Sequence, residues 1–485
     1  MRPLELARLQ SRFRAKPASI TAMRVPHIDF ARSAAAKLVA AAALLAMAAQ
    51  PASAQSVLRD AETEKLLDDM AAPLVEAAGL APGNVDIVLI NDPSINAFVA
   101  GGQAVYIHSG LIDKADTANE VQGVIAHELG HITGGHIVRY GEGVGQATKI
   151  TVLSMLLGAV AAAAGAADAG MAAMMAGQRA AIGRFLAFSR VQESSADAAG
   201  SEYLSKAGIS GRGSIEFFKK LQNQEFRYGF SQDDEAAFTR THPLSGDRIS
   251  TLRETYIADP AWDAPDDPEL QARFERVKAK LYGYIHTPAR VLQRYPETVQ
   301  TTPARYARAY AHHNNAMIDK ALVETEALMA TDPDDPYFLE LKGQVMLESG
   351  KPDQALEPLR RSTELSNSDP LIASMFGHAL IATEDKDNFA EAEQVLRNAV
   401  ARDRRNPFAW YQLGVVYAAR GDMPRARLAS AEQQVMSGEY ARALRSAQAA
   451  EAGLPEYTPD WLRAQDIRLQ ATAELERDDN RRGRR

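Results

Sequence analysis

The stretch Val124-Ile125-Ala126-His127-Glu128-Leu129-Gly130-His131 contains the pattern H-E-x-x-H inside an apolar run. Residues four apart lie on the same face of a helix, so His127 and His131 can direct two imidazoles at one metal ion, with Glu128 beside them. Apolar neighbours indicate that this helix is buried, and a buried pair of histidines needs partners. The stretch therefore predicts the core of a zinc hydrolase. The alternative is a surface helix with two solvated histidines.

The third metal ligand separates the classes of zinc protease that share this pattern. In the class with three histidines the last one follows His131 by six residues, but that position holds Ile137, and His136 lies one residue too early. A later glutamate is the alternative ligand, and Glu193 fits it. Asp197 lies one helical turn further on, where it can accept the outer N–H of a ligating imidazole. Two acids at this spacing are otherwise typical of a solvated face, but the small residues around them favour close helix packing.

Further motifs follow in a fixed order along residues 57–256. They are Asn96-Ala97-Phe98, Gly101-Gly102, Val105 to Leu111, His127 to His131 with Gly134-Gly135-His136, Glu193 to Asp197, and Thr241-His242-Pro243 with Arg248-Ile249. This series resembles the peptidase family of the CAAX prenyl proteases and the HtpX-type membrane proteases. The pairing with C-terminal helical repeats is similar to the periplasmic BepA/YfgC-type members of that family.

The resemblance implies a role for each residue of the core pattern. One zinc ion per chain would be bound by His127, His131 and Glu193, with Glu128 as the general base and Asp197 as an outer partner of a ligand. It also implies unfolded or misassembled outer-membrane proteins as clients. The β-barrel assembly machinery is the implied partner of the repeats.

Two residues of the last motif are candidates for a direct or supporting role. His242 can reach the metal region from its loop, where Pro243 restricts it toward an extended conformation. It would either stabilise the tetrahedral oxyanion or occupy the fourth zinc position. Arg248 can brace that loop by pairing with a carboxylate. Alternatively, both are exposed loop residues.

The N-terminal segment has the organisation of a secretory signal peptide. Residues 1–37 carry eight basic and two acidic side chains, the apolar run Leu38 to Ala49 follows, and Ala52-Ser53-Ala54 offers a small-x-small cleavage site. The apolar run is too short for a membrane span, which needs about 20 residues. We expect cleavage near Ala54 and a periplasmic location. Met1 and Met23 are both candidate start sites.

Composition limits the partners and the means of stabilisation. The full chain has a formal net charge of −8, and residues 1–54 contribute +6, so the remainder is strongly acidic, at −14. An acidic body argues against nucleic acid as a partner. The sequence contains no cysteine, so disulfides cannot stabilise the fold.

A short sheet is expected beside the metal-binding helix. Residues 57–79 have helical spacing of apolar residues, whereas 85–90 and 103–107 are rich in β-formers, and Gly101-Gly102 marks a hairpin turn. Extended substrates can pair with a sheet edge. The candidate substrate-binding residues on this edge are Asn96, Phe98, Gly101 and Gly102. The alternative is an ordinary exposed hairpin.

Residues 150–167 carry no charge and are long enough to suggest a transmembrane helix. A single crossing would separate His127 and His131 from Glu193. A second crossing would need residues 170–188, which contain Arg179 and Arg184. We therefore predict a helical hairpin over residues 146–188 that covers the active site and contacts a membrane surface or a partner.

The C-terminal half contains a repeat of about 34 residues. Prolines, alanines and glycines recur at this period: Pro303, Pro336, Pro370, Pro407; Ala321, Ala355, Ala392, Ala426; Gly343, Gly377, Gly414. This is the tetratricopeptide period, in which helical pairs pack closely at small residues and proline starts the next unit. A three-residue insertion is expected near Glu384 to Asn388. Such arrays are usually docking surfaces, and a purely structural role is the alternative.

These patterns predict a mainly α-helical α+β protein. A zincin-like catalytic domain with a small β-sheet precedes an α-solenoid of tetratricopeptide repeats. The expected boundaries are a signal peptide (1–54), a metalloprotease domain (55–256), a linker and connecting helix (257–300), the repeats (301–475) and a disordered tail (476–485). The expected function is a periplasmic zinc endopeptidase and chaperone. The alternatives are a repeat-based adaptor with latent peptidase activity, and an integral membrane protease.

Overall fold

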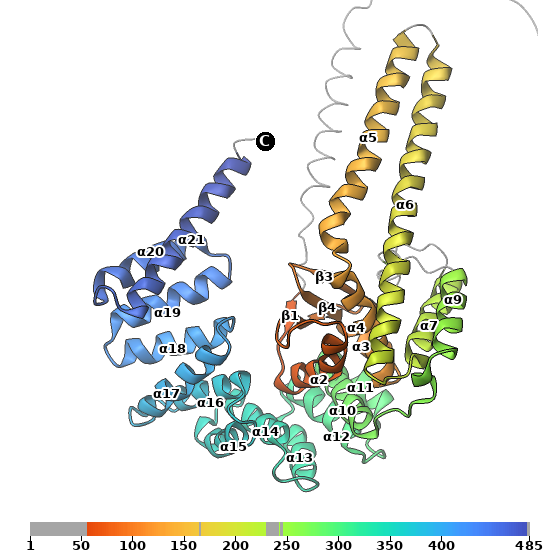
Figure 1. The fold of residues 1–485 in the computed structure, drawn as a ribbon. Coiled ribbons are helices and arrows are strands. Elements are labelled where there is room, and N and C mark those ends of the chain that lie inside the picture. The colour runs from red at the N-terminus through yellow and green to blue at the C-terminus, as the bar shows by residue number, and fades with distance from the viewer. Residues whose placement is uncertain (1–55, 164–165, 229–241, 243–245, 483–485) are drawn as a thin grey trace, which may run out of the picture. The chain divides into compact units, whose positions relative to one another are not determined.

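The N-terminal half contains a four-stranded sheet, drawn at the red end of the chain in Figure 1. This computed structural model describes residues 56–163, 166–228, 242 and 246–482, and residues 55–485 form one compact unit. The predicted signal peptide, Thr241 and Pro243 lie outside the described residues. The strands are β1 Ser56–Leu58, β2 Asp86–Asn91, β3 Ala97–Ala100 and β4 Ala104–His108.

The sheet has the order β1-β2-β4-β3, so β3 is an edge strand, as expected. Strands β2 and β4 are parallel, whereas β3 and β4 form an antiparallel hairpin in which Phe98 pairs with Tyr106. Gly101 and Gly102 form its turn at φ values of 62° and 108°, a region that glycine adopts readily. The predicted helix over 57–79 was partly wrong, because Val57 belongs to β1.

Helix α4 lies at the centre of this domain. Asp60 caps α2 (Ala61–Ala77), whose apolar face packs against α4, and α3 (Ser109–Lys114) connects the sheet to α4 (Ala118–Thr133). Every α4 residue from Ala118 to His131 is buried. A helix buried on all sides has no solvated face, so the alternative of exposed histidines does not hold.

A long helical hairpin follows α4. It consists of α5 (His136–Ala163) and α6 (Ala167–Lys206), which run side by side in Figure 1. The hairpin is longer at both ends than the predicted 146–188. Because α6 itself carries Glu193, the base of the hairpin forms part of the site, and the expectation of a cover over the site was wrong.

Residues 257–300, predicted as a linker and connecting helix, contain a short 3-10 turn followed by two helices. Helices α7 (Arg212–Tyr228) and α9 (Gly246–Ile257) precede this turn. The stretch itself contains the 3-10 turn η2 (Pro260–Asp263), α10 (Pro268–Ile285) and α11 (Pro288–Arg294). Helix α10 buries Phe274 and Val277 in the core of the N-terminal half. Its Lys280 is buried and pairs with Asp60 at 2.5 Å and Glu62 at 3.2 Å.

The C-terminal half is a series of helical pairs, as the repeat predicted. The pairs are α12 (Thr302–His313) with α13 (Ile318–Met329), α14 (Pro336–Glu348) with α15 (Pro352–Leu365), α16 (Pro370–Ala382) with α17 (Asn388–Arg402), α18 (Pro407–Ala419) with α19 (Met423–Met436), and α20 (Tyr440–Gly453) with α21 (Pro459–Arg482).

The small residues of the repeat explain its tight packing. A Cβ on Gly343 would lie 2.3 Å from Leu359 Cγ, and one on Gly377 would lie 2.5 Å from Leu396 Cγ. The repeat prolines stand in the first turn of α12, α14, α16 and α18, where no intrahelical N–H is lost. Helix α21 reaches Arg482, so residues 476–482 are helical where we expected a tail.

Candidate metal centre

Helix α4 presents the two histidines of the pattern to the same point. Thr117 caps the helix by accepting a hydrogen bond from the Glu120 N–H. His127 and His131 are one turn apart, with their ring centroids 4.8 Å from each other. Phe218 of α7 packs edge-on against the His127 ring. Packing in the core therefore fixes the orientation of the His127 ring.

Small residues bring α6 unusually close to α4. A Cβ on Gly130 would lie 2.6 Å from the Ala196 carbonyl oxygen, and one on Gly200 would lie 3.1 Å from the Ala126 carbonyl carbon. This close packing, predicted from the small residues around the acids, allows Glu193 and Asp197 to reach the histidines. Both acids are buried, at 3% and 7% exposure.

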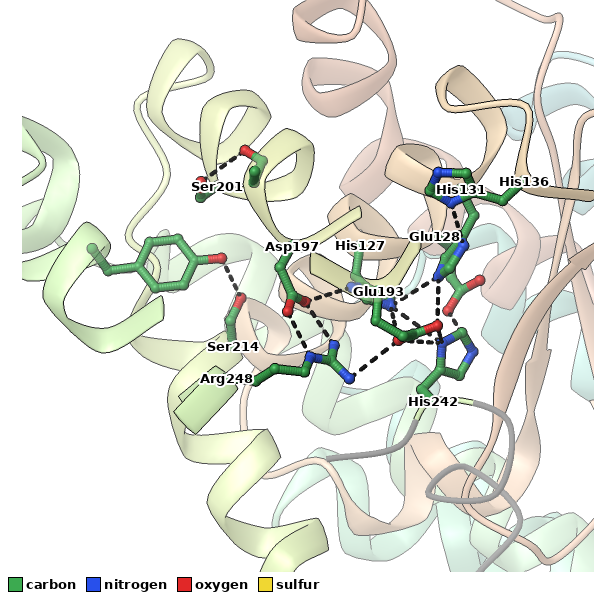
Figure 2. Close-up of polar contacts among 12 residues, drawn as sticks. His127, Glu128, His131, His136, Glu193, Asp197, Ser201, Ser214, His242 and Arg248 are labelled. Atoms are coloured by element: carbon green, nitrogen blue, oxygen red, sulfur yellow. Dashed lines mark hydrogen bonds and ion pairs between the residues drawn. The ribbon is translucent and has the colours of Figure 1, made fainter. Parts of the chain in front are cut away.

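Four side chains converge on one point in Figure 2. One donor atom from each of His127, His131, Glu193 and His242 lies within 4.8 Å of all the others. His127 Nε2 is 3.1 Å from His131 Nε2 and 3.2 Å from His242 Nδ1. The Glu193 carboxylate is 3.5 Å from each α4 histidine and 3.2 Å from His242 Nδ1.

These distances fit a tetrahedral metal ion. With zinc–nitrogen and zinc–oxygen bonds of about 2.0–2.1 Å, the ligand atoms of a tetrahedron lie about 3.3–3.4 Å apart. The observed separations of 3.1–3.5 Å span this value. Imidazole nitrogens and a carboxylate are the donors that zinc takes in proteins.

The outer contacts of the two histidines orient their lone pairs. His127 Nδ1 lies 3.0 Å from Asp197 Oδ1, and because a carboxylate only accepts, the proton of this ring is on Nδ1. The His127 Nε2 lone pair then faces the convergence point. His136, at the start of α5, places its Nδ1 2.9 Å from His131 Nδ1. The sequence offered His136 only as a misplaced third ligand, so this contact was missed.

Arg248 of α9 binds both acids of α6. Its Nε and Nη2 donate to the two oxygens of Asp197 at 2.8 and 2.9 Å, and its Nη1 lies 3.2 Å from Glu193 Oε2 (Figure 2). All three residues are buried. The predicted pairing of Arg248 with a carboxylate is present, and neither Arg248 nor His242 is an exposed loop residue.

The cluster is electrostatically suited to a cation. Burial alone would lower the pKa of His127, but the carboxylates of Asp197 and Glu193 reverse this effect and raise it to about 10. Burial, together with the charges of His127 and His242, lowers the pKa of His131 to about 2. The two acids therefore attract positive charge into a space that cannot accommodate several protonated imidazoles.

Glu128 lies beside the cluster without belonging to it. It is fully buried, and within the described part of the chain neither of its carboxylate oxygens has a hydrogen-bond partner. His242 Nε2 lies 3.5 Å from Glu128 Oε1. Burial raises the pKa of Glu128 above its ordinary value, which makes this carboxylate a stronger base.

The predicted substrate residues lie on or next to β3. Phe98 is on β3, and its ring stacks on that of Tyr106 with centroids 5.2 Å apart. Asn96 is buried and immediately precedes the first residue of β3. Gly101 and Gly102 form the exposed turn. Strand β3 packs against α4, so this edge borders the helix that carries both histidines. Substrate binding by these residues stays a prediction.

Comparisons with known proteins agree with this geometry. Residues 58–256 match the model of peptidase family M48. The metalloprotease LoiP of Escherichia coli is 30% identical over 205 residues, which cover 41% of this chain and 73% of LoiP. The chain belongs to peptidase family M48. Residues 58–256 carry the family match, and the helical pairs described above follow them.

Two longer relatives extend the similarity beyond the peptidase domain. A putative beta-barrel assembly-enhancing protease of Vibrio cholerae is 28% identical over 291 residues, which cover 59% of this chain and 59% of that protein. The beta-barrel assembly-enhancing protease of E. coli is 24% identical over 398 residues, which cover 80% of this chain and 78% of that protein. The match thus spans less than two thirds of the Vibrio relative and more than two thirds of the E. coli one.

Proposed function

We propose that this chain is a zinc-dependent endopeptidase of the periplasm that also acts as a chaperone for outer-membrane proteins. The observation that carries the proposal is the convergence of His127, His131 and Glu193 beside the buried base Glu128. A zinc ion bound by these three residues would lower the pKa of a water molecule and polarise the scissile carbonyl.

Glu128 performs the proton transfers in this proposal. Its carboxylate, buried beside the ligands, takes the proton of the attacking water and later delivers it to the leaving amine. The raised pKa suits both steps, because a stronger base accepts the proton and its acid form persists until the amine leaves.

Asp197, His136 and Arg248 keep the ligands in position. Asp197 fixes the proton of His127 on Nδ1, and His136 makes the corresponding contact with His131. The bidentate contact of Arg248 holds Asp197 and compensates its negative charge.

His242 is proposed to control access to the centre. Its Nδ1 lies 3.2 Å from His127 Nε2 and its Nε2 lies 3.5 Å from Glu128 Oε1, so it would take the fourth position on a zinc ion and exclude the attacking water. Cleavage then requires His242 to move away. We call the form with His242 moved away the open form. A bound client shifts the equilibrium toward it by no more than the difference between its affinities for the open and closed forms.

The edge strand β3 is the proposed binding site for the extended substrate. Among the described residues no further strand pairs with β3 (Ala97–Ala100), and its main-chain groups would offer hydrogen bonds that depend little on substrate sequence. Such binding fits a protease that acts on unfolded segments.

Clients, partners and location rest on the resemblance and on the names of the relatives. Relatives from V. cholerae and E. coli are called beta-barrel assembly-enhancing proteases. The signal-like segment 1–54 supports export to the periplasm. We infer that misassembled outer-membrane proteins are the clients and that the repeats dock on the β-barrel assembly machinery.

A second function, that of an adaptor with minor peptidase activity, is favoured by the length of the repeat array. Five helical pairs cover residues 302–482, which exceeds the number needed to stabilise a solenoid. Replacing the base alone separates the two functions, because the adaptor surface lies on other elements.

The test is Glu128→Gln, which preserves shape and removes the base. Cleavage of an unfolded β-barrel protein should fall by about two to four orders of magnitude with the metal content unchanged. Glu202→Gln, which replaces an exposed glutamate on α6, is the matched control and should cleave normally. Cleavage by Glu128→Gln at the wild-type rate would refute the proposed role of Glu128. If the inactive variant fully replaces the wild type in cells, the adaptor function is the relevant one.

A further inference from the structure

The distal part of the α5–α6 hairpin exposes large apolar side chains to solvent. We call residues 150–163 and 166–178 the apolar end; they contain a single charged residue, Asp168. Helix His136–Ala161 is long and apolar enough to cross a membrane, and only 11% of its most apolar window is buried. On α5 the exposed side chains, at 50–67%, are Val152, Leu153, Met155, Leu156, Leu157 and Val160.

These side chains extend over more than half of the helix circumference and do not form one narrow stripe. At about 100° per residue, the arc from Met155 through Val152 to Leu157 covers about 200° of α5. Met171 and Met175 of α6 are also exposed, at 59% and 52%. A protein partner that docks on an amphipathic helix covers a stripe of roughly 100°. Exposure over such a wide arc instead fits a hairpin whose whole outer surface contacts an apolar medium.

The contact between α5 and α6 differs from their exposed faces, because small residues lie in it. A Cβ on Gly177 would lie 1.9 Å from Ser154 Cβ, and one on Gly158 would lie 2.4 Å from Met174 Cγ and 2.7 Å from the Gly170 carbonyl oxygen. Met174 is therefore a large side chain that partly enters this contact. Helices that pair in water usually place their large apolar residues in the contact. Helices that pair in lipid place small residues there and turn the large ones outward. The apolar end follows the second arrangement.

Basic residues border the apolar end on both helices. We call them the basic collar: Arg139, Lys149, Arg179, Arg184 and Arg190. All five are exposed, and Glu142 is the only acid in residues 137–149 and 179–192. Residues 55–485 carry a net charge of −14, so this concentration of positive charge is local. An apolar segment bordered by basic residues is complementary to anionic lipid.

We propose that the apolar end inserts into an anionic phospholipid membrane, with Lys149 and Arg179 at the headgroups and the rest of the basic collar facing the membrane surface. Residues 150–163 are about 21 Å long, which is less than the hydrocarbon thickness of about 30 Å. The hairpin therefore enters and leaves on the same side. This resolves the topological objection to a membrane segment, because His127 and Glu193 stay together outside the lipid.

Insertion would fix the height of the catalytic centre above the membrane. Glu193 lies 14 residues beyond Arg179 on α6, or about 21 Å along the helix. An extended chain covers that distance in about six or seven residues. A client that emerges from the membrane would be cut at least that far from its anchored part. This consequence rests on the proposed peptidase function, whereas insertion itself does not.

The direct test places a fluorophore on the apolar end. Because the sequence has no cysteine, Leu156→Cys gives one labelling site in residues 55–485. An environment-sensitive dye at this site should shift to the blue with phosphatidylglycerol vesicles and be quenched by brominated lipid. Val323→Cys, whose parent residue is 65% exposed on α13, is the matched control and should show neither change. An unchanged spectrum at position 156 would overturn the proposal.

Vesicle flotation tests the same claim without a label. Leu153→Glu with Leu157→Glu should weaken binding roughly 100-fold or more, since each charge would enter lipid. Val323→Glu with Leu469→Glu adds the same charges at exposed apolar sites of the repeats and should bind as the wild type does. Asp168→Asn removes the only charge of the apolar end and should tighten binding. Weaker binding by Asp168→Asn would contradict insertion.

Two further measurements separate insertion from its rivals. If the apolar end instead joins two copies of the chain, sedimentation without lipid will show a dimer that the Leu153→Glu/Leu157→Glu variant loses, and the wild type will not float. The inactive Glu128→Gln variant should still bind vesicles. Normal cleavage of a soluble peptide without vesicle binding would reject insertion while leaving the peptidase function intact.

Discussion

The two ends of α6 differ in what they bury. Near the C-terminal end, Glu193 and Asp197 are 3% and 7% exposed, whereas near the N-terminal end Met171 and Met175 are 59% and 52% exposed. Both ends depart from the usual distribution of charged and apolar residues. Each departure indicates a partner that the chain does not itself supply, a cation at one end and lipid at the other. Function is therefore concentrated where local packing rules fail.

The largest effect is expected at the C-terminal end of α6, where Glu193 lies. Glu193→Ala removes a ligand and should lower cleavage by about three orders of magnitude or more, because several kcal/mol of transition-state stabilisation is lost with the metal. Vesicle binding should stay unchanged. The double variant Leu153→Glu/Leu157→Glu should lose vesicle binding and cleave a soluble peptide at the wild-type rate. Loss of both activities in either variant would show that the two ends do not act separately.

A smaller loss of metal binding is expected when the carboxylate beside a ligand is replaced. Asp197→Asn keeps the ligand set but replaces the carboxylate that faces His127, so metal affinity should fall about 10- to 100-fold. Competition with a chelator measures this change. Wild-type affinity in Asp197→Asn would remove Asp197 from the role of orienting His127.

A smaller effect is expected for His242→Ala. If His242 blocks the centre, the variant should bind metal nearly as well as the wild type and cleave folded proteins that the wild type spares. Peptide turnover and metal content are measured together. A fall in turnover of roughly two to three orders of magnitude would instead identify an oxyanion stabiliser. An unchanged rate and selectivity would exclude both roles.

The smallest effect compares two helical glycines, Gly130 of α4, which packs against α6, and Gly183 in the middle of α6. Gly130→Ala places a Cβ 2.6 Å from Ala196 and should cost about 1–3 kcal/mol of unfolding free energy. Gly183→Ala on α6 meets no atom within 4 Å and should stabilise by about 0.5–1 kcal/mol. Urea unfolding of both variants checks the signs. Equal effects would mean that α4 and α6 are not closely packed in solution.

Much of the site was predictable because its chemistry depends on helical spacing. His127 and His131 share a face of α4, and Glu193 and Asp197 share a face of α6, so each pair could be read from the sequence. The close packing of the two helices also followed from small residues near Glu193. The repeats were predictable for the same reason, because proline and glycine recur at a fixed period.

The remaining features depend on contacts between distant segments. The contact of His136 with His131 requires the turn between α4 and α5, which no local pattern specifies. Helix α10 follows a proline-rich stretch that resembles a linker, yet its Phe274 enters the catalytic core. The short strand at Val57 pairs with Ile90, and its apolar residues also fit a helix. The outward orientation of the large apolar side chains on α5 was not predictable, because it depends on which face of α5 packs against α6.

The most direct test of the account is the metal content of the wild-type protein, combined with zinc X-ray absorption. We predict one zinc per chain, with nitrogen and oxygen neighbours at about 2.0–2.1 Å. The zinc should be lost when His127, His131 and Glu193 are replaced together by alanine. A wild-type protein without zinc, or a triple variant that retains one zinc per chain, would contradict the assignment of this cluster as the metal centre.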